Sequence, residues 1–182
     1  VNKQVIEANQ VIITGGAWSE ELLSPLGINF IVKPQKAQII HLHIENVDTS
    51  SWPVVMPPNN QYILSFEEGR VVVGATHEDD VGFDLRVTAG GVHEILSKAL
   101  EVAPGLDESS MVETRVGFRP FTPGFLPVIG PIQGYDGLLV ANGLGASGLT
   151  SGPFLGLELA NLAMGKETEL ELQLYSPENA IE

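Results

Sequence analysis

The close spacing of the apolar runs between residues 30 and 74 constrains the fold more than any other feature. Four short runs rich in β-branched and apolar residues lie in that stretch, at 30–32, 38–44, 62–66 and 70–74. Strands this close together leave too little chain for the crossover helices that a parallel sheet needs. The residues between the last two runs indicate a hairpin turn. The sequence therefore predicts an α+β fold with a largely antiparallel or mixed sheet and flanking helices.

Two strand-to-glycine junctions outside that stretch predict a smaller α/β arrangement. A buried strand is expected at Val11–Thr14, ended by Gly15-Gly16, with a short helix beginning near Ala17. A second buried strand is expected at Leu138–Ala141, followed by a glycine-rich loop and a helix from about Leu149 to Met164. Glycines at such a junction let backbone N–H groups face a cofactor.

A further helix is expected from Ala89 to Val102, because its apolar residues recur at helical spacing and Thr88 can cap its start. Another strand is expected from Met111 to Phe118. The tail after Lys166 has only a weak alternating pattern, and no linker divides the chain clearly.

The charge balance excludes several classes of partner. With 23 acidic and 9 basic residues, the formal net charge is −14. Such a surface repels phosphate backbones and anionic headgroups, so binding to nucleic acid or to a membrane surface is not expected. The chain has no cysteine, which excludes disulfides and thiolate sites within it. This composition, and a start without a signal-peptide core, favour a cytoplasmic location.

One uncharged stretch, residues 137–157, is long enough to cross a bilayer. Several glycines, Asn142 and Pro153 interrupt it, and it lacks the continuous large apolar side chains of a span. A buried strand, a loop and a buried helix explain this composition better, so no membrane span is expected.

Two clusters of polar residues could suggest metals. His41 and His43 share one face of a strand, but no third ligand stands at metal-site spacing. The acidic residues of segment 78–84 lack a calcium-loop pattern. Half-exposed sheet histidines and solvated carboxylates are therefore expected, with no metal site. No nucleophile motif of the Gly-x-Ser-x-Gly type supports hydrolase chemistry.

Four glycine-bearing segments follow one another along the chain, at residues 12–19, 72–78, 117–130 and 143–150. They include Thr-Gly-Gly-Ala-Trp, Val-Gly-Ala-Thr, Gly-Phe-Arg-Pro and Gly-Leu-Gly-Ala-Ser-Gly. Each alone is a common turn sequence. Their order and spacing together resemble the D-amino-acid oxidase and glycine oxidase superfamily of FAD-dependent oxidoreductases.

The resemblance is to the C-terminal, substrate-domain portion of that family. The Gly-x-Gly-x-x-Gly turn that holds the FAD pyrophosphate does not occur, so the chain is expected to be a fragment. The resemblance implies a remnant of the FAD-binding α/β domain at 1–28 and a substrate-binding domain at 29–116. A return segment with the final helix follows at 117–165, and a tail at 166–182.

The resemblance also implies a site. Arg119 would hold the substrate carboxylate, a task that suits a guanidinium because it stays charged and binds both oxygens; a surface ion pair is the alternative. Tyr62 would place its hydroxyl near the same carboxylate, with cross-strand packing as the alternative. FAD is the implied cofactor, and no catalytic side chain or metal is assigned. The implied FAD contacts are Gly15, Gly16, Ala17, Trp18, Gly117, Gly145, Ala146, Ser147, Gly148, Leu149 and Thr150.

Two positions depart from the family pattern. Glycine-oxidase-like members often carry a bulky or basic residue in the loop that is Leu144–Ser147 here. A second arginine near the substrate is therefore absent, which puts glycine itself in doubt as the substrate. The stretch Lys33–Gln38 resembles the family's Arg-Pro-x-x-Gly-Gln, with Ala37 in place of the glycine.

For the full-length protein, the resemblance implies oxidation of the C–N bond of an amino acid or related amine by hydride transfer to flavin N5. Two alternatives stay open: a flavoenzyme for N-methylated amino acids or 2-hydroxy acids, and a flavin-free binding domain. The chain without its other half is expected to be inactive and to bind FAD weakly or not at all. It is also expected to self-associate through uncovered surface or to be fragile.

Overall fold

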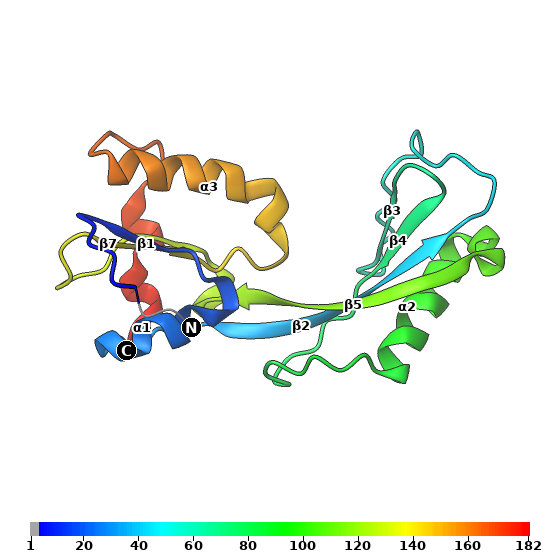
Figure 1. Ribbon diagram of the computed structural model, residues 1–182, viewed down its shortest axis with the longest axis horizontal. Helices are drawn as coiled ribbons and strands as arrows, with labels where there is room; N and C mark the ends of the chain where they lie inside the picture. The colour runs from blue at the N-terminus through cyan, green and yellow to red at the C-terminus, as the bar shows by residue number, and fades with distance from the viewer. Residues whose placement is uncertain (1–3) are drawn as a thin grey trace. The chain divides into compact units, whose positions relative to one another are not determined.

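A computed structural model describes residues 4–182 and divides the chain into two compact units (Figure 1). Unit 1 combines the residues up to Pro34 with those from Arg119 onward, and unit 2 is Gln35–Phe118. Because unit 1 is assembled from two separated segments, no single linker in the sequence marks the division. The domain boundaries expected from the sequence, at 28/29 and 116/117, stay predictions.

A three-stranded sheet in the order β1-β7-β6 forms the middle layer of unit 1. β1 (Val11–Ile13) pairs in parallel with β7 (Leu138–Asn142), and β6 (Val128–Pro131) pairs antiparallel with β7. Side chains alternate along β7, so Leu139 and Val140 enter different cores on opposite faces of the sheet.

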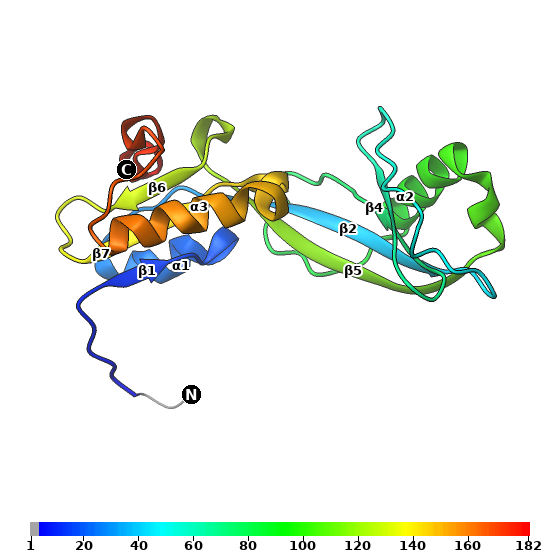
Figure 2. The same cartoon turned by 90° about the horizontal axis from the view of Figure 1, so that it is seen from above.

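Helices cover both faces of this sheet (Figures 1 and 2). α3 (Gly148–Ala163) packs Leu155 and Leu159 on one face. On the other face, α1 (Ser19–Leu23) contributes Leu23 to a core that includes the fully buried Phe30. Short 3-10 turns flank α1 at Gly16–Trp18 and Ser24–Leu26. The segment after α3 adds two more, at Leu172–Tyr175 and Pro177–Ala180.

Unit 2 contains a four-stranded sheet in the order β3-β4-β2-β5. β4 (Arg70–Gly74) pairs antiparallel with both β3 (Tyr62–Ser65) and β2 (Lys33–His43). β5 (Ser110–Phe121) is the other neighbour of β2. The hairpin lies where the sequence predicts it, and the prediction of a largely antiparallel or mixed sheet is confirmed.

α2 (Ala89–Val102) covers one face of this sheet and has the predicted bounds. Thr88 caps it as predicted, because its Oγ1 accepts a hydrogen bond from the Gly91 N–H at 3.1 Å. The helix packs Ile95 and Ala99 into a single apolar core. The sheet and the 3-10 turn Pro104–Glu108 supply its other buried members, Ile40, Leu42, Ile63, Val71, Val73 and Leu106.

Some local predictions are wrong. β6 was not predicted, because four residues that include glycine and proline give no strand signal. β2 begins at Lys33 instead of Gln38, since its first residues are polar and carry no apolar alternation. The expected strand at 30–32 is reduced to one bridge between Phe30 and Ile181. The helix expected at 149–164 begins and ends one residue earlier, at Gly148 and Ala163.

Across residues 4–182, no helix reaches both the length and the apolar character required to cross a bilayer.

Candidate functional site

A pocket of about 290 Å³ lies in unit 1, where β7 continues into α3. The ends of β1 and β7, the loop after β7 and one face of α3 form its walls. None of the thirteen described residues that line it is charged, and six are glycines: Gly16, Gly143, Gly145, Gly148, Gly152 and Gly156. Ligands of α/β folds commonly bind at such a place, outside the carboxyl ends of parallel strands and beside a helix N-terminus.

Three of these glycines lie on α3, where the lack of a side chain exposes the helix backbone to the pocket. A Cβ at Gly148 or Gly156 would meet no other residue's heavy atom within 4 Å, and one at Gly152 would meet only Leu144 Cδ1, at 3.8 Å. Residues spaced by four lie on one helix face, so the three glycines form a continuous strip. Such a strip would let a flat ligand approach the helix backbone closely, where larger side chains would hold it away.

The N-terminus of α3 reaches the same pocket through Gly148. The N-cap residue Ser147 makes no side-chain capping hydrogen bond. The Thr150 hydroxyl donates to the Ser147 carbonyl oxygen at 3.1 Å, so it does not cap the helix either. The dipole of α3 is positive at this end, which favours a negatively charged ligand edge there.

Asn142, the last residue of β7, connects two walls of the pocket. Its Nδ2 donates to the Gly16 carbonyl oxygen at 2.8 Å and to Ser19 Oγ at 2.7 Å. Its Oδ1 accepts from the Gly143 N–H at 2.7 Å. The side-chain amide thus uses both donor hydrogens and its oxygen, and Asn142 is only 5% exposed.

The residues predicted to contact FAD are distributed unevenly. Gly16, Gly145 and Gly148 line the pocket. The other unit 1 residues of that prediction are not among its described lining residues: Gly15, Ala17, Trp18, Ala146, Ser147, Leu149 and Thr150. Gly117 lies on β5 in unit 2. The FAD contacts as a set stay a prediction.

Arg119 is half-buried on β5 and directly precedes Pro120, which lines the pocket. Pro120 lies over the Gly16 turn, because a Cβ at Gly16 would be 3.9 Å from Pro120 Cγ. The backbone at Arg119 is therefore held at the edge of the pocket. Its binding of a substrate carboxylate stays a prediction.

Tyr62 lies on the face of the unit 2 sheet where Gly74 provides space for its ring. Tyr62 and Gly74 are directly opposite in the register of β3 and β4. A Cβ at Gly74 would lie 3.1 Å from Tyr62 Oη and 2.7 Å from Ile39 Cγ2. A glycine at position 74 is thus required for the observed tyrosine orientation, while the role of Tyr62 toward a substrate stays a prediction.

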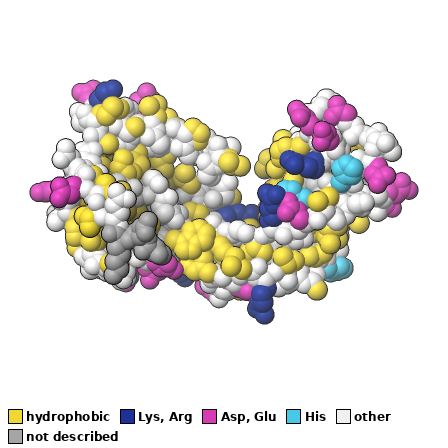
Figure 3. Space-filling view, viewed as in Figure 1, with side chains coloured by type: hydrophobic (Ala, Val, Ile, Leu, Met, Phe, Trp, Pro, Cys, Tyr) yellow, Lys and Arg dark blue, Asp and Glu magenta, His cyan; other side chains and the backbone are white. Residues whose placement is uncertain are grey.

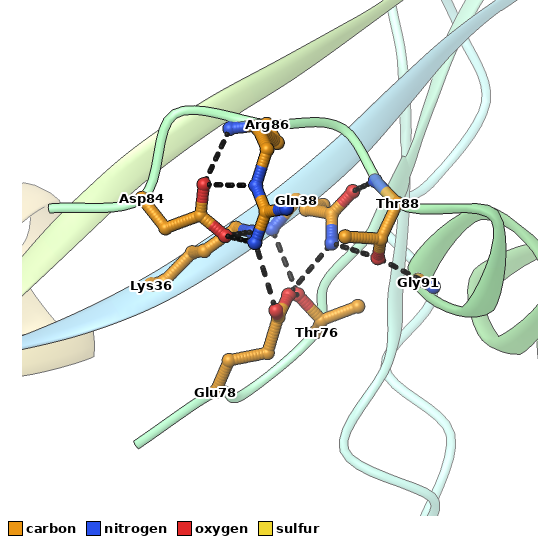
Figure 4. A network of polar contacts seen from close by, with 8 residues as sticks. All are labelled: Lys36, Gln38, Thr76, Glu78, Asp84, Arg86, Thr88 and Gly91. Carbon is orange, nitrogen blue, oxygen red and sulfur yellow. Dashed lines mark hydrogen bonds and ion pairs between the residues drawn. The ribbon is translucent and has the colours of Figure 1, made fainter. Parts of the chain in front are cut away.

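Unit 2 also contains a polar network at the start of β2, shown in Figure 4. Lys36 is fully buried, and its Nζ lies 3.4 Å from Glu78 Oε2 and 3.2 Å from Asp84 Oδ2. Gln38 Nε2 donates to Glu78 Oε1 at 2.7 Å and to Thr88 Oγ1 at 2.9 Å. The network therefore fastens the segment between β4 and α2 to β2. Lys36 and Gln38 belong to the stretch in which Ala37 replaces the family's glycine.

The two carboxylates of this network are held in their charged forms. Desolvation raises the pKa of Glu78, but hydrogen bonds from Gln38 and Thr76 and the charge of Lys36 outweigh it, so the pKa lies below its ordinary value. Hydrogen bonds from Arg86, and then Lys36, hold the pKa of Asp84 well below its ordinary value.

The candidate metal residues make contacts with protein groups. His41 Nδ1 lies 3.7 Å from Glu113 Oε1. Burial and then the charge of Arg115 lower the pKa of His41, which favours a neutral ring. In the acidic segment, Asp79 accepts a hydrogen bond from Gln35 Nε2 at 2.9 Å. Within residues 4–182, no group of three or more histidine, cysteine or acidic residues could hold a metal ion.

Two other cavities are less suited to an anionic planar ligand. One of about 590 Å³ in unit 2 is open to solvent and bordered by the carboxylates of Asp48, Glu67 and Glu68. One of about 260 Å³ in unit 1 lies beside the loop after β7, with Phe125, Phe154 and other aromatic and apolar side chains in its lining. Neither has the strip of bare helix backbone that the glycine-lined pocket has.

Ten of the thirteen described lining residues are not among the predicted FAD contacts, and three of the ten, Asn142, Gly152 and Gly156, shape the pocket. Asn142 was noted only as a polar interruption, although an amide at the end of an apolar strand and next to Gly143 is a recognisable signal. Gly152 and Gly156 were treated as parts of an apolar helix. Their spacing of four from Gly148 indicates a bare helix face, which the pattern alone could have revealed.

Comparison with known proteins identifies the family. Residues 1–162 match the model of the DAO family, described as FAD dependent oxidoreductase. An uncharacterized oxidoreductase of Bacillus subtilis (strain 168), YurR, is 66% identical over 96% of this chain and 47% of its own length. A glycine oxidase of Pseudomonas aeruginosa is 32% identical over 94% of this chain and 46% of its own length.

Comparison with solved structures leads to the same family. The iminodiacetate oxidase IdaA from Chelativorans sp. BNC1 is 52% identical, with a TM-score of 0.91 over 94% of this chain and 47% of its own. The glycine oxidase from Geobacillus kaustophilus is 32% identical, with a TM-score of 0.84 over 93% of this chain and 45% of its own. The chain thus spans about half the length of these relatives. It belongs to the FAD-dependent oxidoreductase family of the D-amino-acid oxidase type.

Proposed function

We propose that this chain is half of an FAD-dependent enzyme that oxidises the C–N bond of an amine bearing a carboxylate. The glycine-lined pocket at the N-terminus of α3 is the observation that carries the proposal. The relatives contain a further half that this chain does not span, and the protein with both halves is called the full-length protein below. The chain alone is proposed to be inactive.

When bound, FAD would take up the hydride lost from the carbon beside the amine. The residues of this chain bind and orient. Gly148, Gly152 and Gly156 would let the ring approach the α3 backbone, and the positive end of the α3 dipole would favour negative charge on the ring. Arg119 would hold the substrate carboxylate and so place the reacting carbon.

A side chain added to the glycine strip tests the pocket. In the full-length protein, Gly156→Leu should weaken FAD binding by about 100-fold, because the leucine would occupy space needed by the ring. The fold should survive, since a Cβ at position 156 would meet no other residue and leucine favours a helix over glycine by about 0.8 kcal/mol. A fluorescence titration with FAD and a thermal melt measure the two effects.

Gly90→Leu is the matched control, because Gly90 also lies in a helix, has nothing within 4 Å of its Cβ position and lies outside the pocket. It should leave the FAD affinity unchanged. A folded Gly156→Leu protein that binds FAD like the wild type would contradict the proposal.

For the substrate, we propose a secondary amine that carries a carboxylate. The relative with 52% identity is an iminodiacetate oxidase, and iminodiacetate is a secondary amine with two carboxylates. The absence of a basic residue in Leu144–Ser147 argues against glycine itself. Anaerobic mixing with iminodiacetate or an N-methylated amino acid should bleach the bound FAD, whereas a 2-hydroxy acid should not. Bleaching by the hydroxy acid alone would refute the amine assignment.

Arg119→Ala tests the carboxylate contact. The Michaelis constant should rise by about 100-fold, since a charge-assisted pair contributes roughly 3 kcal/mol. Arg119→Lys should recover part of the loss, because the charge remains while the two-pronged geometry is lost. Unchanged kinetics in the alanine variant would remove Arg119 from the site.

The chain alone is also proposed to self-associate, through apolar surface that the relatives' other half would cover. Exposed apolar side chains in unit 1 include Ile12 on β1 at 43%, and Leu149 and Leu157 on α3 at 94% and 55%. Figure 3 shows apolar side chains on the surface of unit 1 near β1 and α3. A flavin-free binding domain remains the competing function, and a full-length protein without flavin absorbance would favour it. A cytoplasmic location stays a prediction.

A further inference from the structure

Asn142 hydrogen-bonds to both glycine turns that border the pocket of unit 1. Its partners Gly16 and Ser19 are separated from it by 126 and 123 residues, whereas Gly143 is its immediate neighbour. Asn142 is 5% exposed and Ser19 is fully buried, so water does not compete well for these groups.

The orientation of the amide is fixed by its partners. The Gly16 carbonyl can only accept a hydrogen bond, so the NH₂ group must face it, and the Gly143 N–H can only donate, so the oxygen must face it. If the amide were rotated by 180°, its oxygen would face the Gly16 carbonyl oxygen and its NH₂ group would face the Gly143 N–H. Neither hydrogen bond could then form. The side chain therefore joins the turn at Gly16 to the loop at Gly143 in one arrangement only.

Both joined segments form the pocket, because Gly16 and Gly143 are among its lining residues. Gly143 itself has little freedom, since it has a φ of +83° and its Cβ position is blocked by Thr122 Oγ1. The Gly16 turn is anchored by Asn142 and by the start of α1, since the Ser19 N–H also donates to the Gly16 carbonyl oxygen.

We propose that Asn142 is a positioning residue that sets the width of the flavin pocket by holding the Gly16 turn against the Gly143 loop. The identity of the ligand as a flavin rests on the proposed function. The joining of the Gly16 turn to the Gly143 loop by Asn142, called the clamp below, does not. Asn142 does not touch the reacting atoms in this proposal; it acts through the two turns.

Two substitutions in the full-length protein test the clamp by hydrogen exchange. Asn142→Ala removes every contact, so amide exchange should accelerate by about tenfold in peptides covering both 16–19 and 143–147. Asn142→Asp keeps the size and the acceptor for the Gly143 N–H but places a carboxylate oxygen against the Gly16 carbonyl. Exchange should therefore accelerate at 16–19 and stay near wild type at 143–147.

Asn179→Ala serves as the matched control. It deletes an amide in the same unit that donates only a long 3.4 Å hydrogen bond to the Leu174 carbonyl oxygen and does not line the pocket. Exchange at both peptides and the FAD dissociation constant should match the wild type. In Asn142→Asp the FAD dissociation constant should rise by about tenfold.

The outcomes distinguish the proposed clamp from the proposed FAD-dependent function. Equal exchange at 16–19 in Asn142→Asp and wild type would overturn the clamp, and this variant decides the matter even if Asn142→Ala fails to fold. An opened turn with unchanged FAD affinity would overturn the positioning role. A wild-type protein that binds no FAD would overturn the proposed function, while the exchange pattern would still support or refute the clamp.

Discussion

The two units stabilise their loops in different ways. In unit 2, the segment between β4 and α2 is fastened by charges, with Lys36 fully buried between Glu78 and Asp84. In unit 1, the turns that form the pocket are joined by the neutral amide of Asn142, and no charged residue is among the pocket's described lining. The pocket instead has the positive end of a helix dipole, which would suit the flavin ring proposed to bind there.

The largest expected effect of this difference comes from removing the buried cation. Lys36→Met should destabilise the protein by about 3 kcal/mol, because Glu78 and Asp84 lose the buried cation that lies between them, although Asp84 keeps its ion pair with Arg86. Urea unfolding measures the loss. The control Lys98→Met removes a lysine whose i,i+4 pair with Glu94 on α2 is partly exposed, and it should cost about 0.5 kcal/mol or less. Equal losses in the two variants would mean that the Lys36 network does not stabilise unit 2.

A second variant tests the packing of unit 2 independently of its charges. Gly74→Ala should cost about 2 kcal/mol, because its Cβ would lie 2.7 Å from Ile39 Cγ2 and close to the Tyr62 ring. Thermal denaturation gives the loss, and an altered chemical shift of the Tyr62 ring would show its displacement. Gly90→Ala, whose Cβ meets nothing, should be neutral or slightly stabilising. An undisturbed Tyr62 in Gly74→Ala would show that Gly74 does not set its position.

Acid should distinguish the charged network from the neutral clamp. The folded-state pKa values of Glu78 and Asp84 lie below their ordinary values, so their contribution is present at neutral pH and is lost as the pH falls through the folded-state values. Exchange rates corrected for intrinsic chemistry should rise with acid in peptides covering 76–88 and change less at 16–19. Glu78→Gln should weaken this acid response. Equal acid-dependent increases in exchange at 76–88 and at 16–19 would contradict the difference drawn between the charged network and the neutral clamp.

The smallest expected effect on stability concerns the uncovered surface of unit 1. Ile12→Lys in the isolated 182-residue chain should reduce self-association while changing the unfolding free energy by about 0.5 kcal/mol or less, since Ile12 is partly exposed. Sedimentation equilibrium reports the association. Val5→Lys, at a residue that is 87% exposed outside any strand, is the control and should change neither quantity. A monomeric wild-type chain would show that this surface needs no partner.

Local patterns predicted much of the fold. The bounds of α2 follow from its apolar spacing and from Thr88, and the β3–β4 hairpin follows from two apolar runs around a turn. The start of β2 escaped prediction because Lys36 and Gln38 are buried by partners about 40 to 50 residues away, which no local pattern shows.

The same limit applies to the site. The predicted glycine segments at residues 15–18 and 143–150 contain Gly16, Gly145 and Gly148, which line the pocket, because glycines are visible in the sequence itself. Asn142 was not predicted, because its importance depends on Gly16 and Ser19, more than 120 residues earlier. A polar side chain at the end of an apolar strand can be recognised in the sequence, but its role becomes clear only when its distant partners are known.

The most direct test of the central claim is a crystal structure of the full-length protein with FAD bound. The account predicts that difference density for the flavin ring lies in the glycine-lined pocket, against Gly148, Gly152 and Gly156. Ring density in the cavity bordered by Phe125 and Phe154, or away from the N-terminus of α3 altogether, would contradict it.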